Sequence, residues 1–466
     1  MKFVKKVFSY AIGNGLSKFI AVIILPIYTN YLNPQEYGKA DLAYYTVSII
    51  VSFAFMECWT ALLRFIYDDY TSENRKKVFS NIVFLSILLL IPYILLQYLV
   101  SIFIAKEFAW LSCIYGVVYL ITQILQIYAR AIKDTKTFVV SGVVNSVVQL
   151  IVACILTMYL KVGATIVLIA PIMGALGANL YLIFETKCIK DISFHECIDK
   201  KLLKNICVFC IPLAFNSIAF WAMNNINRYF AAYFIGYEAS SFVSIASKLT
   251  MIITLAASVY SLAWQENAFE NSNNQQKNQI YTKMFRIYIF VFSVATIFSI
   301  LFVKLIFPII IGSQYNATLE ILPTYFVAVY FSGISSFLGQ IFGAEKKTLP
   351  LLSSTIVGTI TNLIIVVALI KKINILAIPI GSLLGYLNCT IMRYISLHKT
   401  VQITINMKEI GKALSLIFIS FLMFYFQQGF FHFIIFAIIL LILVYFLYNN
   451  IIKETFNKLL RREQKK

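Results

Sequence analysis

The chain has 466 residues, of which 60% are hydrophobic, 16% are aromatic and only 13% are charged. A soluble domain keeps about a quarter of its residues charged, so this composition excludes a soluble globular protein and predicts an all-α protein that spans a membrane many times. The net charge of +19 would suit a nucleic-acid partner only if the basic residues formed a patch.

Fourteen apolar segments follow one another, and each has the ~20 residues that cross a hydrocarbon layer as a helix. The first is an uncleaved membrane helix rather than a signal peptide, because the apolar stretch after MKFVKK runs on to about Leu32 and no small-x-small cleavage site follows. In chain order the predicted spans are 7–31, 40–63, 79–102, 109–129, 138–160, 163–184, 206–230, 240–264, 287–311, 320–342, 350–370, 374–397, 412–428 and 431–449.

The Lys and Arg residues between the spans predict the orientation. With a cytoplasmic N-terminus, thirty of the 39 basic residues lie in inner segments. The outer segments hold five, which are Lys39, Lys106, Lys161, Lys371 and Lys372. Both termini are therefore expected in the cytoplasm, and a nucleic-acid partner is excluded because the charge is a topology signal. The loops are too short for a soluble catalytic domain, so the function is expected between the helices.

A weak internal repeat relates two halves of the chain. Three pairs of segments match in the same order: YLNPQE from Tyr31 with YFIGYE from Tyr233, KDTKT from Lys133 with AEKKT from Ala344, and SGVVNSVVQLIV from Ser141 with STIVGTITNLII from Ser354. A repeat of six helices keeps the orientation, so its axis would run along the membrane normal. We therefore predict an N-terminal lobe (1–205), a C-terminal lobe (206–400), and a helix pair with a basic cytoplasmic tail (401–466).

Among the ionisable residues within predicted spans, Lys18, Lys248 and Glu57 lie farther from the span ends, where a charge is costly enough to mark a functional site. Lys18 lies ~17 Å into the first span by helical rise, on the same face as Asn14, and this depth is too great for the side chain to reach the interface. Lys248 lies in the eighth span, where snorkelling to the interface is an alternative. Glu57, in the second span, is either a proton or ion site or a structural partner of a lysine.

Polar side chains also line three further spans. They are Asn216, Asn224, Asn227 and Arg228 in the seventh, Asn145 and Gln149 in the fifth, and Asn362 in the eleventh. Such stripes either hold helices together or line a cavity, and their recurrence in corresponding helices of the two halves favours a shared polar cavity. Snorkelling explains Arg228 equally well.

Enzyme motifs are absent from the sequence. It contains no G-x-x-x-x-G-K-[ST], no H-E-x-x-H and no dinucleotide-binding loop. Cys207 and Cys210 form a C-x-x-C in an apolar segment with no second pair, which is typical of buried small side chains rather than a metal site. We therefore predict no enzyme activity, no catalytic residue, no cofactor and no metal.

Two motifs carry a resemblance to a known family. The first is Leu-x-x-x-Glu-Tyr-Gly, from Leu32 to Gly38, and the second is FIGYEASSFVSIASKL, from Phe234 to Leu249. The second resembles a gly-x-tyr-x-x-ala-x-lys segment, with Ser241 and Phe242 in place of Gly and Tyr. Over about residues 1–400 the chain resembles the polysaccharide-transporter branch of the multidrug, oligosaccharidyl-lipid and polysaccharide (MOP) exporter superfamily, the O-antigen and capsule repeat-unit flippases of Wzx type.

The resemblance implies a flippase in the bacterial cytoplasmic (inner) membrane, working in lipopolysaccharide O-antigen or capsule synthesis. Its substrate would be an undecaprenyl-pyrophosphate-linked oligosaccharide, moved to the outer leaflet by alternating access. Lys18 and Lys248 would bind the pyrophosphate, the amides and hydroxyls would bind the sugars, and Glu57 is the candidate for coupling to an ion gradient. Membrane lipid, the polymerase and the chain-length proteins are the implied partners.

Three alternatives stand beside this interpretation. A lipid II flippase belongs to the same superfamily and also has fourteen helices. A multidrug or cation antiporter of the same fold would bind cations, and two central lysines count against it. A membrane repeat-unit polymerase is a different class with one large outer loop, which this chain lacks.

Overall fold

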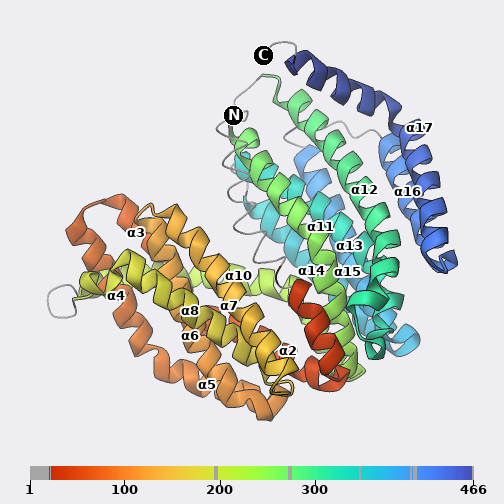
Figure 1. The fold of residues 1–466 in the computed structure, drawn as a ribbon. Coiled ribbons are helices and arrows are strands. Elements are labelled where there is room, and N and C mark those ends of the chain that lie inside the picture. Colours follow the sequence, from red (N-terminus) through yellow and green to blue (C-terminus); the bar gives the residue numbers. More distant parts are fainter. Residues whose placement is uncertain are drawn as a thin grey trace. The chain divides into compact units, whose positions relative to one another are not determined.

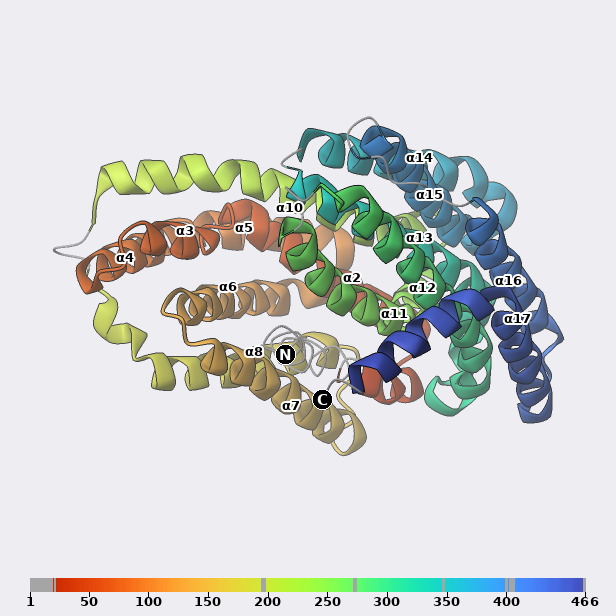
Figure 2. The same ribbon diagram turned by 90° about the horizontal axis from the view of Figure 1, so that it is seen from above.

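The computed structural model describes residues 20, 22–193, 198–270, 275–345, 348–398, 401 and 407–463. For some helical residues, among them Asn216, only the backbone is described. These parts of the chain form α-helices joined by short 3-10 helices and turns, without a strand (Figures 1 and 2). The predicted all-α fold class is confirmed.

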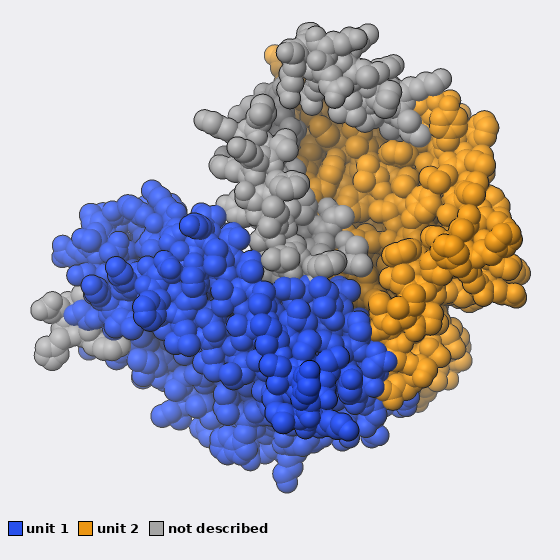
Figure 3. Space-filling model, in the orientation of Figure 1, with its two compact units in different colours: residues 1–244 blue, residues 245–466 orange. Residues whose placement is uncertain are grey.

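The chain divides into two compact units, residues 1–244 and 245–466 (Figure 3). Unit 1 contains α2 (Pro34–Ala54), α3 (Thr60–Asp68), α4 (Ser72–Leu88), α5 (Leu90–Ala105), α6 (Ala109–Ala131), α7 (Thr135–Met158), α8 (Ile166–Thr186) and α10 (Lys200–Phe234). Helix α11 (Tyr237–Glu270) begins in unit 1 and ends in unit 2. Unit 2 continues with α12 (Lys277–Ile310), α13 (Thr318–Ala344), α14 (Thr348–Ile373), α15 (Ala377–His398), α16 (Met407–Phe426) and α17 (Phe430–Glu463). The predicted lobes, 1–205 and 206–400, stay a prediction.

Nine segments of the described chain are long and apolar enough to cross a membrane. Two of them each contain two helices joined by a 3-10 turn. These are 90–131, with η1 (Lys106–Phe108), and 349–398, with η4 (Asn374–Leu376). The multi-pass architecture agrees with the sequence analysis, while the count of fourteen spans stays a prediction.

Side-chain caps explain where several helices begin. Asn33 precedes α2 and accepts a hydrogen bond from the Glu36 amide at 2.8 Å, with Pro34 at the first helical position. Asp134 accepts from the Thr137 amide at 3.0 Å before α7. Asp199 accepts from the amide of Lys201 at 2.8 Å before α10. Each cap pairs an amide that has no partner inside the helix.

The second predicted span, 40–63, is interrupted in the structure. Helix α2 ends at Ala54, and α3 begins at Thr60 after a turn in which Met56 and Glu57 both have φ of 52°. This left-handed conformation costs about 1–3 kcal/mol for a residue with a Cβ. The Thr60 hydroxyl donates to the Glu57 carbonyl at 2.9 Å, which holds the turn. The prediction of one continuous helix over 40–63 was therefore wrong. Nothing in the sequence indicated the break, because no Gly or Pro lies at it.

The third predicted span, 79–102, also divides, at Leu89 between α4 and α5. Pro92 explains this break, because proline has no amide to donate to the carbonyl four residues earlier and its ring crowds that carbonyl. A proline signal was therefore present in the sequence.

Close helix pairs recur in the two units. Helix α7 lies along α8 in unit 1, and α14 lies along α15 in unit 2 (Figures 1 and 2). The repeat segment from Ser141 lies in α7, and its match from Ser354 lies in α14. In unit 2, α16 and α17 both pack against α12. The matched segments therefore occupy corresponding positions in the order of elements.

Candidate functional site

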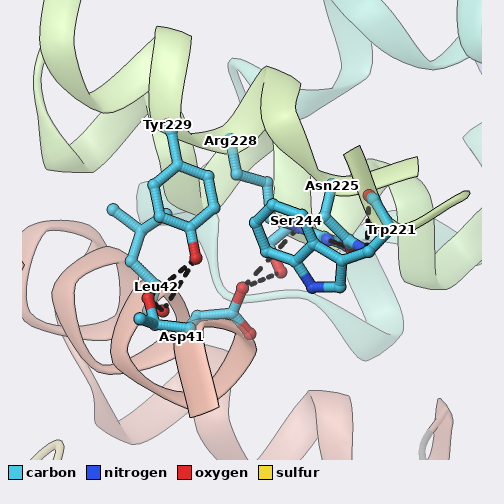
Figure 4. A network of polar contacts seen from close by, with 8 residues as sticks. Asp41, Leu42, Trp221, Asn225, Arg228, Tyr229 and Ser244 are labelled. Atoms are coloured by element: carbon cyan, nitrogen blue, oxygen red, sulfur yellow. Dashed lines mark hydrogen bonds and ion pairs between the residues drawn. The ribbon is translucent and has the colours of Figure 1, made fainter. Parts of the chain in front are cut away.

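A buried ion pair joins α2 to α10 within unit 1 (Figure 4). Asp41 is 1% exposed and Arg228 is 4% exposed. The Arg228 Nε lies 3.8 Å from the Asp41 Oδ2, and the Ser244 hydroxyl donates to the same oxygen at 2.5 Å. The guanidinium carbon lies 3.8 Å from the centre of the Tyr45 ring. The arginine charge is thus balanced by a carboxylate and an aromatic face.

Uncharged contacts continue this network along the same two helices (Figure 4). The Tyr229 and Thr46 hydroxyls lie 2.8 Å apart. The Trp221 Nε1 donates to the Ser48 hydroxyl at 3.1 Å, and the Trp221 and Tyr229 ring centres are 5.4 Å apart. The indole therefore has one defined orientation on α10.

Asn225 links the indole region to the ion pair. Its side-chain oxygen accepts a hydrogen bond from the Arg228 Nη1. Its side-chain nitrogen donates to the Trp221 carbonyl at 3.2 Å. The Asn225 carboxamide therefore connects the Arg228 guanidinium to the backbone of α10 at Trp221.

A polar pocket of about 290 Å³ lies beside this network. It is lined by Ser48, Ile49, Ser52, Glu57, Tyr119, Ser217, Ile218, Trp221, Asn224 and Asn225. Of these lining residues none is Lys, Arg or His, and Glu57 is the acidic one. No group of three or more His, Cys, Asp or Glu side chains that could hold a metal ion occurs in the described ranges.

An apolar pocket of about 400 Å³ shares Ile218 with the polar one. Its other lining residues are Phe53, Ala54, Met56, Leu89, Pro92, Leu96, Ile211, Ala214 and Phe215. The left-handed turn after α2 places Met56 in the apolar pocket and Glu57 in the polar one. The strained backbone thus separates two neighbouring side chains into different environments, a placement common at functional sites.

The structure brings some of the sequence-predicted site residues together. Glu57 and Asn224 line the polar pocket, and Arg228 belongs to the adjoining network. Asn227 is buried on α10 next to Arg228. These four residues were predicted from two separate spans, and unit 1 places them around one region.

Other predicted site residues lie elsewhere or outside the described chain. Lys18, Asn14 and the side chain of Asn216 lie outside the described residues. Lys248 is half-buried on α11, in unit 2. A pyrophosphate clamp made by Lys18 and Lys248 therefore stays a prediction.

The polar residues of the fifth and eleventh spans lie at close helix contacts. A Cβ built on Gly174 of α8 would lie 2.7 Å from the Asn145 side-chain oxygen and 3.1 Å from the Gln149 Cβ. A Cβ on Gly381 of α15 would lie 2.8 Å from the Asn362 side-chain oxygen. These contacts fit the alternative in which polar stripes hold helices together. Their predicted role in substrate binding stays untested.

Asp41 and Trp221 were not among the predicted site residues. Asp41 is the second residue of the predicted span 40–63, and an acidic residue is ordinary at a helix N-terminus. In the structure α2 starts at Pro34, and Asp41 is buried in its interior. A signal was present, because Asp41 and Arg228 carry opposite charges in two apolar segments. Such charges are expected to pair with each other inside a membrane protein. Trp221 carried no such signal, because aromatic residues are frequent throughout the chain.

Comparisons with known proteins agree with this architecture. The family described as "Polysaccharide biosynthesis protein" matches residues 3–265, and no curated protein matches the chain. A lipid II flippase MurJ in an inward closed conformation has a TM-score of 0.71 at 14% identity, covering 95% of this chain and 99% of its own.

Two structures of a MATE multidrug resistance transporter of the MOP superfamily are also similar. The inward-facing form has a TM-score of 0.68 at 13% identity, covering 84% of this chain and 96% of its own. The outward-facing form has a TM-score of 0.59 at 15% identity, covering 86% and 95%. At these identities the similarity shows a shared fold.

Proposed function

This chain belongs to the polysaccharide biosynthesis protein family, and from this premise we propose that it is a flippase for a polyprenyl-pyrophosphate-linked oligosaccharide. It would move the O-antigen or capsule repeat unit across the bacterial cytoplasmic membrane by alternating access. The observation that carries the proposal is the family match over residues 3–265. The MOP-type fold supports the same class of protein.

The polar pocket of unit 1 supports a glycan as part of the substrate. Its hydroxyl, carboxamide and carboxylate groups, from Ser48, Asn224 and Glu57 among others, can exchange hydrogen bonds with sugar hydroxyls. The Trp221 indole supplies an apolar face of the kind that amphipathic ligands contact.

The same pocket also favours a second candidate. A carboxylate beside aromatic rings, here Glu57 with Trp221 and Tyr119, attracts organic cations. A cation antiporter of the MATE type is therefore the alternative to test. A lipid II flippase is the other, because the MurJ fold is shared along nearly the whole chain.

A transport assay separates these functions. Purified protein in liposomes is supplied with a fluorescent polyprenyl-pyrophosphate-linked oligosaccharide, with lipid II or with ethidium, and movement between leaflets or into the lumen is measured. We expect movement of the lipid-linked oligosaccharide that exceeds protein-free liposomes at least tenfold. Transport of lipid II alone or of ethidium alone would instead assign one of the two alternatives.

Loss of the predicted pyrophosphate clamp is expected to stop this transport. Lys18→Ala and Lys248→Ala each remove a cation that would pair with the pyrophosphate, and the Lys→Arg variants should be milder because the charge is kept. The control is Lys371→Ala, an exposed lysine in the last turn of α14. Transport at the wild-type rate in both alanine variants would contradict the clamp.

The orientation in the membrane is tested by reporter fusions. Fusions after Lys136, Lys204 and Lys466 should report the cytoplasm, because basic residues concentrate in these segments. Fusions near Lys106 and Lys161 should report the external side. A cytoplasmic signal at either outer position would contradict the fourteen-span topology. Association with the polymerase and chain-length proteins is a further prediction of the proposed function.

A further inference from the structure

The side chains that line the polar pocket in unit 1 favour an uncharged ligand with hydroxyl groups over an anionic ligand. Its walls carry the Trp221 indole, the Tyr119 phenol, the carboxamides of Asn224 and Asn225, three serine hydroxyls and the Glu57 carboxylate. A neutral ligand with many hydroxyl groups can exchange hydrogen bonds with the polar side chains among them, because these include both donors and acceptors. An anionic ligand would find no lysine, arginine or histidine among the described lining residues.

The aromatic wall of this pocket is held in place before a ligand arrives. Ser48 accepts from the Trp221 Nε1 at 3.1 Å, and the Tyr229 ring lies 5.4 Å from the indole. Asn225 donates to the Trp221 carbonyl at 3.2 Å. A rigid aromatic surface loses little conformational entropy on binding.

Arg228, a cation beside the pocket, is paired with another carboxylate. Arg228 donates a hydrogen bond to Asn225, one of the lining residues. Its guanidinium is buried, faces Tyr45 and is paired with Asp41. Because Asp41 balances Arg228, the Glu57 carboxylate leaves the described lining of the pocket with a net negative charge. A second negative charge placed there would be repelled.

We propose that this pocket binds one uncharged sugar ring, and that Glu57 excludes phosphate from it, so the pocket determines which end of the lipid-linked substrate enters. This inference rests on the proposed flippase function and assigns part of its site. A volume of about 290 Å³ equals that of about ten waters, which accommodates a monosaccharide rather than a long oligosaccharide. The pyrophosphate must then bind at cations outside this pocket.

Binding of soluble sugars to the purified full-length protein tests the inference without transport. The probes are N-acetylglucosamine and N-acetylglucosamine 1-phosphate, measured by saturation-transfer NMR. The neutral sugar should bind at least about tenfold more tightly than the phosphorylated one, since like charges in contact are strongly disfavoured. Glu57→Gln should reduce this ratio to about threefold or less by strengthening the binding of the phosphorylated probe.

Two further variants separate ligand contact from folding. Trp221→Ala should lose both probes, whereas Trp221→Phe keeps an aromatic face and should retain the neutral sugar. The matched control is Glu107→Gln, which removes another carboxylate of unit 1, one that pairs with Lys39 at 3.2 Å. It should leave the ratio unchanged.

Several outcomes would overturn the inference. They are equal binding of the two probes to the wild type, an unchanged ratio in Glu57→Gln, no binding of either sugar, or Trp221-dependent binding of tetramethylammonium instead of sugar. A protein that flips lipid-linked oligosaccharide with an unchanged Glu57→Gln ratio would keep the proposed function and reject this inference. The expected ratios without any flipping would reject the proposed function and keep the selectivity of the pocket.

Discussion

Gly38→Ala is expected to prevent stable packing of α2 and to remove most folded protein from the membrane. A Cβ on Gly38 would lie 1.9 Å from the carbonyl oxygen of Tyr237 and 2.8 Å from its carbonyl carbon. Both atoms belong to the backbone at the start of α11, so no side-chain rotation relieves the overlap. We expect a loss of about 3 kcal/mol or more, the upper range for overpacking.

The measurement is the amount of monodisperse protein extracted from membranes and its thermal unfolding midpoint. Gly411→Ala is the matched control, because Gly411 is also helical but, among the described residues beyond its own helix backbone, none lies within 4 Å of an added Cβ. That substitution should be neutral or slightly stabilising, since alanine favours a helix over glycine. A Gly38→Ala protein as abundant and as stable as the control would contradict the close contact between α2 and α11.

The same contact gives a physical reason for the two sequence motifs that carried the family resemblance. Gly38 ends the first motif, and Tyr237 lies in the second. In the first motif Tyr37 is fully buried, next to the glycine that permits the close approach. In the second, Gly236 has φ of 136°, a conformation that residues with a Cβ rarely adopt. The short motifs were informative because each contains a position that only glycine satisfies.

The all-α fold and the polysaccharide biosynthesis family could be predicted, because apolar length and these glycine motifs are local signals. The break after α2 could not, because Met56 and Glu57 are ordinary residues in a left-handed turn that tertiary contacts maintain. The break at Leu89 had a local cause, Pro92, yet the apolar run across it continued and concealed it. Hydropathy indicates whether a segment lies in an apolar environment, but it does not indicate whether the helix in that segment is continuous.

Part of the site could be predicted for a similar reason. A charge inside an apolar segment stands out, and this identified Glu57. Arg228 was identified as part of a polar stripe. Asp41 lies only seven residues after the true helix start at Pro34, so a predicted start at residue 40 gave it an ordinary place at a helix end. Trp221 is one of four tryptophans among 29 tyrosines and 40 phenylalanines. Its importance comes from Ser48 and Tyr229, which only the fold brings to it.

Removing one partner of the Asp41–Arg228 pair is expected to destabilise the protein more than removing both. Asp41→Leu leaves the buried guanidinium without its carboxylate, and Arg228→Met leaves the buried carboxylate without its cation. Each should cost about 3–5 kcal/mol, because an uncompensated charge stays buried. The double variant Asp41→Leu/Arg228→Met should recover most of this loss, since apolar side chains of similar volume then fill the site.

Thermal unfolding of the purified variants gives the coupling energy through a double-mutant cycle. The control pair is Lys39 and Glu107, whose charges lie 3.2 Å apart with side chains 30% and 50% exposed. Removing either of these should change stability by only about 0–1 kcal/mol. Additive losses at Asp41 and Arg228 would show that the two charges do not compensate each other.

Transport adds a readout that a purely structural pair would not change. Asp41 on α2 and Arg228 on α10 link two helices, and Arg228 also holds Asn225 at the edge of the polar pocket. A double variant with restored stability has lost this hydrogen bond, so its transport of lipid-linked oligosaccharide should stay below one tenth of the wild-type rate. Transport that recovers together with stability would confine the ion pair to packing, because the pocket would then function without the arginine that orients Asn225.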